Sequence, residues 1–158
     1  MGLYESIFRR RSVRSYSEKK VKDELIDKIE EMIQDPDKLY DDIEMNIEVV
    51  SERKKIDEVF SGLISKYAQV KSPHYLIVSS EPKNNFMVNM GYTIEDIVLK
   101  MTSHEIGTCW IGSGFDESKI KKSFDIDGGT RVKSLLSFGY PKSPKTFEKR
   151  DLDEIKRK

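Results

Sequence analysis

The residues that build disulfides and metal centres are scarce in this sequence. Its 158 residues include one cysteine, Cys109, and two histidines, His74 and His104, which stand far apart. A single cysteine excludes an internal disulfide and a cysteine-based metal cluster. Two distant histidines do not form a metal-binding motif either, so we predict that the protein holds no metal.

An excess of charge of one sign and long apolar runs are also missing. Lysine and arginine together number 28, and aspartate and glutamate together number 28. Proteins that bind nucleic acid usually carry a clear basic excess, so this balance argues against a nucleic-acid partner. No apolar run has membrane-spanning length, and the N-terminus lacks the core of a signal peptide. We expect a soluble, cytoplasmic protein without a membrane partner.

The motifs of enzymes that carry their own catalytic groups are absent as well. There is no G-x-S-x-G nucleophile turn and no G-x-x-x-x-G-K phosphate loop. Cys109 stands beside Trp110 in an expected buried strand, where a small core residue is a better interpretation than a nucleophile. His104 is expected to cap a helix, and His74 has no recognisable partner. An enzyme without its own acid, base or nucleophile relies on a cofactor.

The pattern of apolar residues predicts one α+β domain that spans residues 1–158. The length suits a single compact domain, and helical and strand-like segments are mixed without the strict alternation of a parallel α/β fold. The expected helices cover residues 3–8, 21–33, 54–65 and 85–105, with a short helix starting at 116. The expected strands cover residues 45–49, 74–79, 108–111 and 132–138. Gly107 is expected to be a left-handed cap after the long helix.

Arginine is concentrated near the N-terminus, in the run Arg9-Arg10-Arg11-Ser12-Val13-Arg14-Ser15-Tyr16. The run follows the amphipathic stretch 3–8, and the helix dipole favours cations at a helix C-terminus. Guanidinium groups beside a serine hydroxyl suit a phosphate monoester. A solvated basic helix end is the alternative interpretation of this segment taken alone.

Two weaker signals lie further along the chain. Glycines flank the expected strand in Gly107-Thr108-Cys109-Trp110-Ile111-Gly112-Ser113-Gly114. Glycine lets the backbone approach a flat ligand closely and direct an N–H group at it. A second basic group, Lys145-Thr146-Phe147-Glu148-Lys149-Arg150, could converge on the same anion as the arginine run. A cap followed by a turn, and a solvated tail, are the alternatives for these two segments.

Together these segments resemble the FMN-dependent nitroreductase family. Residues 10–16 resemble its R-R-S-x-R-x-[FY] signature, and residues 71–78 resemble its A-P-x-x-[IL]-V-V strand. Residues 91–112 resemble its central helix and the L-G-x-G-[ST]-C-W-[IL]-G segment that follows. Residues 138–141 and 149–155 resemble its closing G-Y-P and R-x-P-L-x-E-[IV] pattern. The resemblance covers most of the chain, in order and at compatible spacing.

The resemblance implies a mixed, mainly antiparallel sheet flanked by helices, with a long central helix. It also implies a homodimer with FMN at each end of the subunit interface. Arg10 and Ser12 match positions at the FMN phosphate and ribityl chain, and Arg14 matches a cation near flavin N1 and O2. Residues 112–114 match the backbone that faces flavin N5. The expected FMN-binding positions are Arg10, Arg11, Ser12, Arg14, Ile111, Gly112, Ser113, Gly114, Lys149 and Arg150. The resemblance does not say whether Lys149 or Arg150 holds the phosphate more firmly.

Two departures from the family pattern affect the expected flavin site. Many members carry a flavin-contacting asparagine in a P-S-x-x-N-x-Q-P-W-like stretch, and residues 35–43 contain no such motif. The connection between residues 78 and 85 is short, which leaves no room for the segment that covers the flavin in larger relatives. Both departures predict a shallower, more open site.

The resemblance implies an oxidoreductase without catalytic residues of its own. Hydride would pass from NADH or NADPH through FMN to a nitroaromatic, a quinone or a similar acceptor. The alternatives are a flavin-binding carrier or sensor with little turnover, and a member that binds no flavin. Apolar residues on one stripe of the expected long helix predict a homodimer, because a small domain need not bury so many alone. These residues are Met87, Met90, Ile94, Val98 and Met101.

Overall fold

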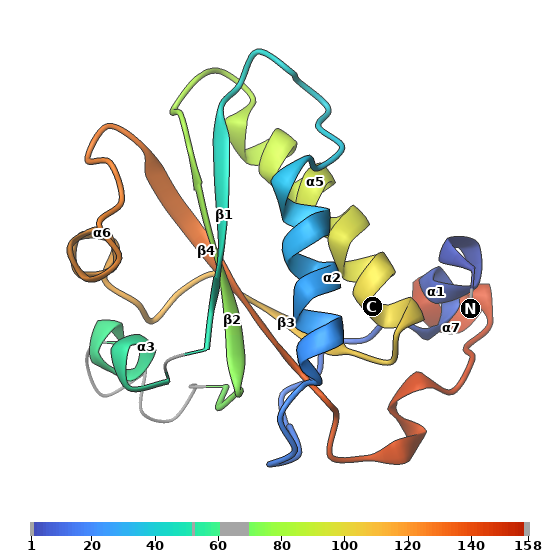
Figure 1. Ribbon diagram of the computed structural model, residues 1–158. Helices are drawn as coiled ribbons and strands as arrows, with labels where there is room; N and C mark the ends of the chain where they lie inside the picture. The colour runs from blue at the N-terminus through green and yellow to red at the C-terminus, as the bar shows by residue number, and fades with distance from the viewer. Residues whose placement is uncertain (1, 52, 61–69, 157–158) are drawn as a thin grey trace.

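The computed structural model describes residues 2–51, 53–60 and 70–156 of the chain. Its centre is an antiparallel sheet of four strands, β1 (Met45–Val50), β2 (His74–Ser80), β3 (Gly107–Ile111) and β4 (Arg131–Gly139). The strand order is β1-β2-β4-β3, so β2 and β4 are central. Every residue of β2 is buried, because helices cover both faces of the sheet (Figure 1). The α+β fold that the sequence predicts is confirmed.

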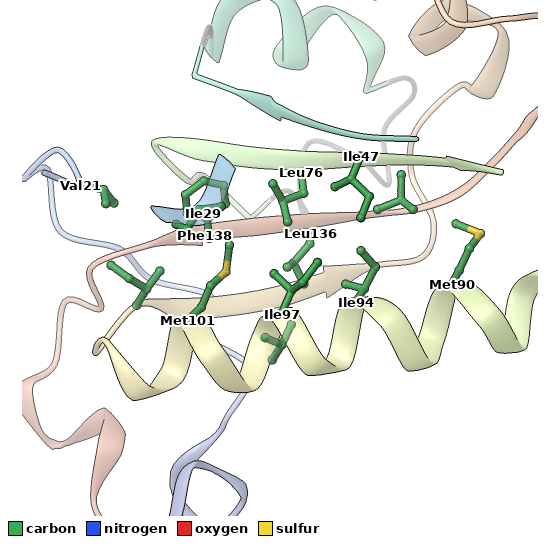
Figure 2. Packing of buried hydrophobic residues seen from close by; sticks show 13 residues of the cluster. Val21, Ile29, Ile47, Leu76, Met90, Ile94, Ile97, Met101, Leu136 and Phe138 are labelled. Atoms are coloured by element: carbon green, nitrogen blue, oxygen red, sulfur yellow. The ribbon is translucent and has the colours of Figure 1, made fainter. Parts of the chain in front are cut away.

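One face of the sheet is covered by the two longest helices, α2 (Asp23–Gln34) and α5 (Phe86–Ser103) (Figure 1). Apolar side chains of α5 point toward β2 and β4, as Figure 2 shows. The labelled residues of this cluster on α5 and the two central strands are Met90, Ile94, Ile97, Met101, Leu76, Leu136 and Phe138. Full burial of such a side chain contributes about 1.5–3 kcal/mol, so this layer supplies much of the stability.

The opposite face is covered by α3 (Arg53–Val59) and α6 (Glu117–Ser123). Ile56 of α3 and Ile120 of α6 are fully buried in a second apolar cluster with Tyr75 and Ile77 of β2. The helix α6 begins at Asp116, whose side chain accepts two backbone N–H groups of the first turn.

Three short elements gather at the C-terminal end of α5. They are α1 (Leu3–Arg9), the 3₁₀ helix η1 (Pro144–Phe147) and α7 (Leu152–Lys156). Ile7 of α1 and Ile155 of α7 line one cavity with Leu99 of α5, which agrees with the arrangement in Figure 1. Segments from both ends of the chain therefore meet on the long helix. Within the described residues, no helix combines the length and the apolar character needed to cross a membrane.

The expected helices and strands agree with the observed ones to within two residues at their ends. The exception is the helix expected over 54–65, because α3 ends at Val59 and residues 61–65 lie outside the described residues. The expected cap at Gly107 is wrong. The left-handed residue after α5 is Glu105, with φ 60°, and Gly107 is the first residue of β3. A Cβ at Gly107 would lie 2.7 Å from Cγ2 of Val13, so this glycine permits a close approach of two segments.

The argument for a dimer from the stripe on α5 is also wrong. Met90, Ile94, Val98 and Met101 are buried in the core of the chain itself, whereas Met87 is 60% exposed. A helical pattern alone does not tell a residue that faces the sheet from one that faces a partner, because both surfaces are apolar.

Candidate functional site

The arginine run continues past the end of α1 and lies beside β3, an edge strand of the sheet. Ser12 pairs with Thr108 at the start of β3, and the Val13 N–H donates to the Thr108 carbonyl at 2.7 Å. Val13 is buried over Gly107, whereas Ser12 and Arg14 on either side of it are exposed. The extended backbone therefore directs Ser12 and Arg14 outward from a fixed base.

The chain that follows β4 holds the same segment from the other side. The Lys142 N–H donates to the Ser15 carbonyl at 3.0 Å. The hydroxyl groups of Tyr16 and Ser137 are 2.9 Å apart, within hydrogen-bond distance. Burial raises the pKa of Tyr16 above its ordinary value, so the phenol stays protonated. The segment is thus fixed at both ends by hydrogen bonds.

Arg150 contacts the arginine run, although 140 residues separate it from Arg10 in the sequence. Its backbone N–H donates to the Phe8 carbonyl at 3.1 Å, and its Nη2 donates to the Arg10 carbonyl. Arg11 Nη2 donates to the Glu148 carbonyl at 2.9 Å. Burial, together with the charges of Arg11 and Arg10, lowers the pKa of the Arg150 guanidinium from its ordinary value. Three guanidinium groups therefore share one small region.

Each of these three arginines has a hydrogen-bond donor without an acceptor. The Nε atoms of Arg10, Arg11 and Arg150 are buried and make no hydrogen bond within the part of the chain that the structure describes. Arg10 Nε lies 3.3 Å from Glu95 Oε1, which is an ion pair by distance but not a hydrogen bond. Buried donors are nearly always paired. The cluster therefore suits an anion that offers several acceptor oxygens.

Two cations next to this cluster, Lys149 and Arg9, have other contacts. Lys149 is exposed, and its Nζ lies 5.5 Å from the centre of the Phe8 ring. Arg9 pairs with Glu5 at 2.6 Å and donates to the Phe147 carbonyl at 3.0 Å. Of the two expected C-terminal cations, Arg150 is the one that lies among the arginines of the run.

Glu95 on α5 connects the arginine cluster to β3, and the sequence analysis missed it. One carboxylate oxygen faces Arg10 Nε, and the other accepts a hydrogen bond from Trp110 Nε1 at 3.2 Å. Glu95 and its neighbour Asp96 are the two acidic residues of α5, and no sequence signal distinguished Glu95 from Asp96. The contact depends on how α5 packs beside β3.

A cavity of about 500 Å³ opens beside the arginine run. Residues 11–15 form one wall, and the other wall is made of Lys142, Ser143, Lys145, Thr146 and Glu148. Its size is in the range of cofactor and substrate sites. The hydroxyl and cationic groups of both walls suit an anionic ligand.

The glycine segment lies at the other end of β3 and does not line this cavity. Four residue steps along a strand separate Thr108 from Gly112, which is roughly 13 Å. A Cβ at Gly112 would meet no atom within 4 Å, and Gly114 has a φ of 86°, which favours glycine. The Asp116 N–H donates to the Val59 carbonyl at 3.0 Å and fixes the end of the segment. The backbone at Gly112 therefore borders open space.

The loop at residues 35–43, which lacks the family's asparagine, is tied to α5. Asn89 is buried, and its Oδ1 accepts the N–H groups of Leu39 at 2.9 Å and Tyr40 at 2.8 Å. These residues do not line the cavity beside the arginine run.

The remaining candidate groups have structural partners. Cys109 is buried, and burial raises the pKa of its thiol, as expected for a core residue rather than a nucleophile. The expectation that His74 has no partner is wrong: its Nδ1 lies 2.8 Å from Ser51 Oγ, and its ring stacks on Phe138. Burial lowers the pKa of His74, so the ring is neutral at pH 7. Among the described residues, no three His, Cys, Asp or Glu side chains are grouped as a metal site would require.

Comparison with known proteins assigns the chain to a family. A family model described as "Putative TM nitroreductase" matches residues 2–158. The chain belongs to this nitroreductase family. A protein of Archaeoglobus fulgidus described as "Putative NADH dehydrogenase/NAD(P)H nitroreductase" is 25% identical over 154 residues, which are 92% of this chain and 88% of that protein. Family membership supports an oxidoreductase function.

Solved structures of other nitroreductases have the same fold. A nitroreductase family protein from Clostridium novyi NT has a TM-score of 0.74 and 26% identity, over 98% of this chain and 91% of that chain. An FMN-dependent nitroreductase from Clostridium difficile R20291 has a TM-score of 0.75 and 16% identity, over 96% of this chain and 93% of that one.

Proposed function

We propose that this nitroreductase is an FMN-dependent oxidoreductase that takes a hydride from NAD(P)H and passes it to a nitroaromatic, a quinone or a similar acceptor. The observation that carries the proposal is the set of buried Nε donors of Arg10, Arg11 and Arg150. A phosphate monoester has three strong acceptor oxygens and nearly two negative charges at pH 7. FMN ends in such a group, and guanidinium groups bind it well.

The other expected residues extend the site away from the phosphate. Ser12 and Arg14 project outward from the fixed segment, so we assign Ser12 to the ribityl chain and Arg14 to the N1 and O2 edge of the flavin. Residues 111–114 are assigned to the N5 edge, because the backbone at Gly112 borders open space. FMN joins its phosphate to a planar ring through a five-carbon chain, so one molecule can contact both ends of β3. We assign Arg150 to the phosphate, and Lys149, which lines a small cavity with Arg11 and Arg150, would add positive charge beside it.

When bound, FMN supplies the hydride chemistry. The chain supplies the anion site, a cation beside the ring and an open backbone edge where substrates can approach. One observation favours the alternative, a flavin carrier or sensor with little turnover. The loop at residues 35–43 is held by Asn89 and does not line the cavity, so it provides no cover there.

The absorption spectrum of the purified protein tests the proposal. We expect a yellow protein that releases FMN, rather than FAD, on denaturation, because the arginine cluster suits a terminal phosphate. Anaerobic NADH or NADPH should bleach the flavin absorption, and menadione or nitrofurazone should restore it. A protein that binds FMN but is not reduced on the time scale of minutes would support the carrier. A protein that binds no FMN would contradict both.

We also propose that the protein is a homodimer. The reason is a set of exposed apolar side chains, and not the apolar stripe of α5, most of which is buried in the core. Large apolar side chains are exposed on α1 and α5, by 44–75%. They are Leu3, Tyr4 and Ile7 on α1, and Met87, Val88 and Tyr92 on α5. The first group lies beside the C-terminal half of α5 and the second on its first two turns, so an interface that runs along α5 would cover both. Light scattering at micromolar concentration should give twice the chain mass of 18.4 kDa, and a monomer with flavin bound would contradict the proposal.

A further inference from the structure

The outer wall of the cavity carries cations that the proposed FMN site does not use. Lys142 and Lys145 are exposed on the segment that follows β4, next to the hydroxyl groups of Ser143 and Thr146. Within the described residues, neither lysine forms an ion pair. The cavity has four cationic residues, these two with Arg11 and Arg14, and one acid, Glu148. Four positive charges less one negative charge leave a formal charge of +3.

This wall is held in place by hydrogen bonds along its length. Lys142 is bound to Ser15 through its backbone, and Thr146 Oγ1 donates to the Ser143 carbonyl at 2.8 Å. Arg9 and Arg11 donate to the carbonyls of Phe147 and Glu148. A fixed backbone reduces the entropy lost when two lysines close on one ligand. The charge and the scaffold together fit a second anionic group, in addition to the phosphate of FMN.

We propose that Lys142 and Lys145 form a subsite for the 2′-phosphate of NADPH, and that the protein therefore prefers NADPH to NADH. The inference rests on the proposed function: the nicotinamide of a hydride donor would lie against the flavin ring at residues 111–114, roughly 13 Å along β3 from Thr108. The adenosine end of the same donor would then extend to this cavity. NADPH and NADH differ only in the 2′-phosphate, a group with nearly two negative charges at pH 7. Because NADPH carries the greater negative charge, a general positive field would also favour it. A control that removes two positive charges outside the cavity therefore separates a subsite from the general field.

The kinetic test uses the double variant Lys142→Gln/Lys145→Gln. Glutamine keeps a polar side chain and removes the charge. We expect the ratio of kcat/KM for NADPH to that for NADH to fall at least about tenfold, which corresponds to about 1.4 kcal/mol. The matched control is Lys119→Gln/Lys122→Gln on α6, which removes two charges from exposed residues outside the cavity. The control should leave the ratio unchanged, and equal losses with both donors in the cavity variant would overturn the proposal.

A binding test needs no turnover. Isothermal titration calorimetry of the purified protein with 2′,5′-ADP and with 5′-AMP compares two ligands that differ by the same phosphate. We expect the wild type and the α6 control to bind 2′,5′-ADP at least about tenfold more tightly, and the cavity variant to lose that difference. If the wild type does not distinguish the two ligands, the subsite is refuted. If the protein binds no FMN and oxidises neither donor, the proposed function fails, and calorimetry still decides about the subsite.

Discussion

Arg10→Ala is expected to weaken FMN binding by roughly ten- to hundredfold, the value of one hydrogen bond to a charged group. The substitution removes one of the three buried guanidinium donors and leaves Glu95 without its cation, 3.3 Å from where Arg10 Nε was. An unpaired carboxylate beside a phosphate adds repulsion. Fluorescence titration of the purified protein with FMN gives the dissociation constant.

The matched control is Arg9→Ala, one residue earlier in the same run. The Arg9 guanidinium is already engaged by Glu5 and by the Phe147 carbonyl, so it has little capacity left for a ligand. We expect its dissociation constant for FMN to stay within about threefold of the wild-type value. If both variants lost the same FMN affinity, only the total positive charge of the run would matter for binding. Unchanged binding in Arg10→Ala would remove this arginine from the phosphate site.

Arg14→Ala separates tuning of the flavin from its retention. Arg14 is exposed and is assigned to the flavin ring, so the variant should keep most of its FMN affinity. Reduction adds negative charge to the ring, and a nearby guanidinium stabilises that charge. Because solvent screens an exposed cation, we expect the potential to fall by only about 30 mV, or about 1.4 kcal/mol for a two-electron couple. Spectroelectrochemical titration measures it, and an emptied site with an unchanged potential would refute the assignment.

Phe138→Ala is expected to lower the free energy of unfolding by about 3–5 kcal/mol. Phe138 is fully buried on the central strand β4 and stacks on His74 with ring centres 5.1 Å apart. Its carbonyl also accepts the buried Ser72 hydroxyl at 2.6 Å, so displacement of the strand would affect a second contact. For a domain of this size, each kcal/mol shifts the melting temperature by about 2–4 °C. A fall of roughly 6–20 °C should appear in thermal unfolding followed by circular dichroism.

Leu39→Ala serves as the control for Phe138→Ala. Leu39 is an apolar residue with 47% of its surface exposed. Its backbone N–H, which Asn89 binds, is unchanged by the substitution. We expect a loss below about 1 kcal/mol, because little apolar area leaves the core. If Phe138→Ala lowered the free energy of unfolding as little as Leu39→Ala, the cluster between α5 and the sheet would not dominate the stability.

The order and type of the helices and strands could be predicted from the sequence, because the period of the apolar residues reflects which side chains are buried. The run at residues 74–79 has no polar alternation, and the structure shows β2 buried on both faces. The sequence also indicated the nitroreductase family, which the family match confirms. The roles that this resemblance gives to the arginine run, the glycines after β3 and the C-terminal cations stay predictions. It could not tell a core stripe from an interface stripe on α5, since both are apolar.

Tertiary structure alone decided which of the cations lie together. Arg9, Arg10 and Arg11 are three consecutive residues of the same type, yet each has a different partner. Glu5 pairs with Arg9, and Glu95 faces Arg10. Arg11 donates to the Glu148 carbonyl. Arg150 rather than Lys149 joins the cluster because its backbone is bound to Phe8, which lies far away in the sequence. Hydrogen bonds are short and directional, so their partners depend on the packing of whole elements. Local sequence supplies the donors, and only the fold brings them into one cluster.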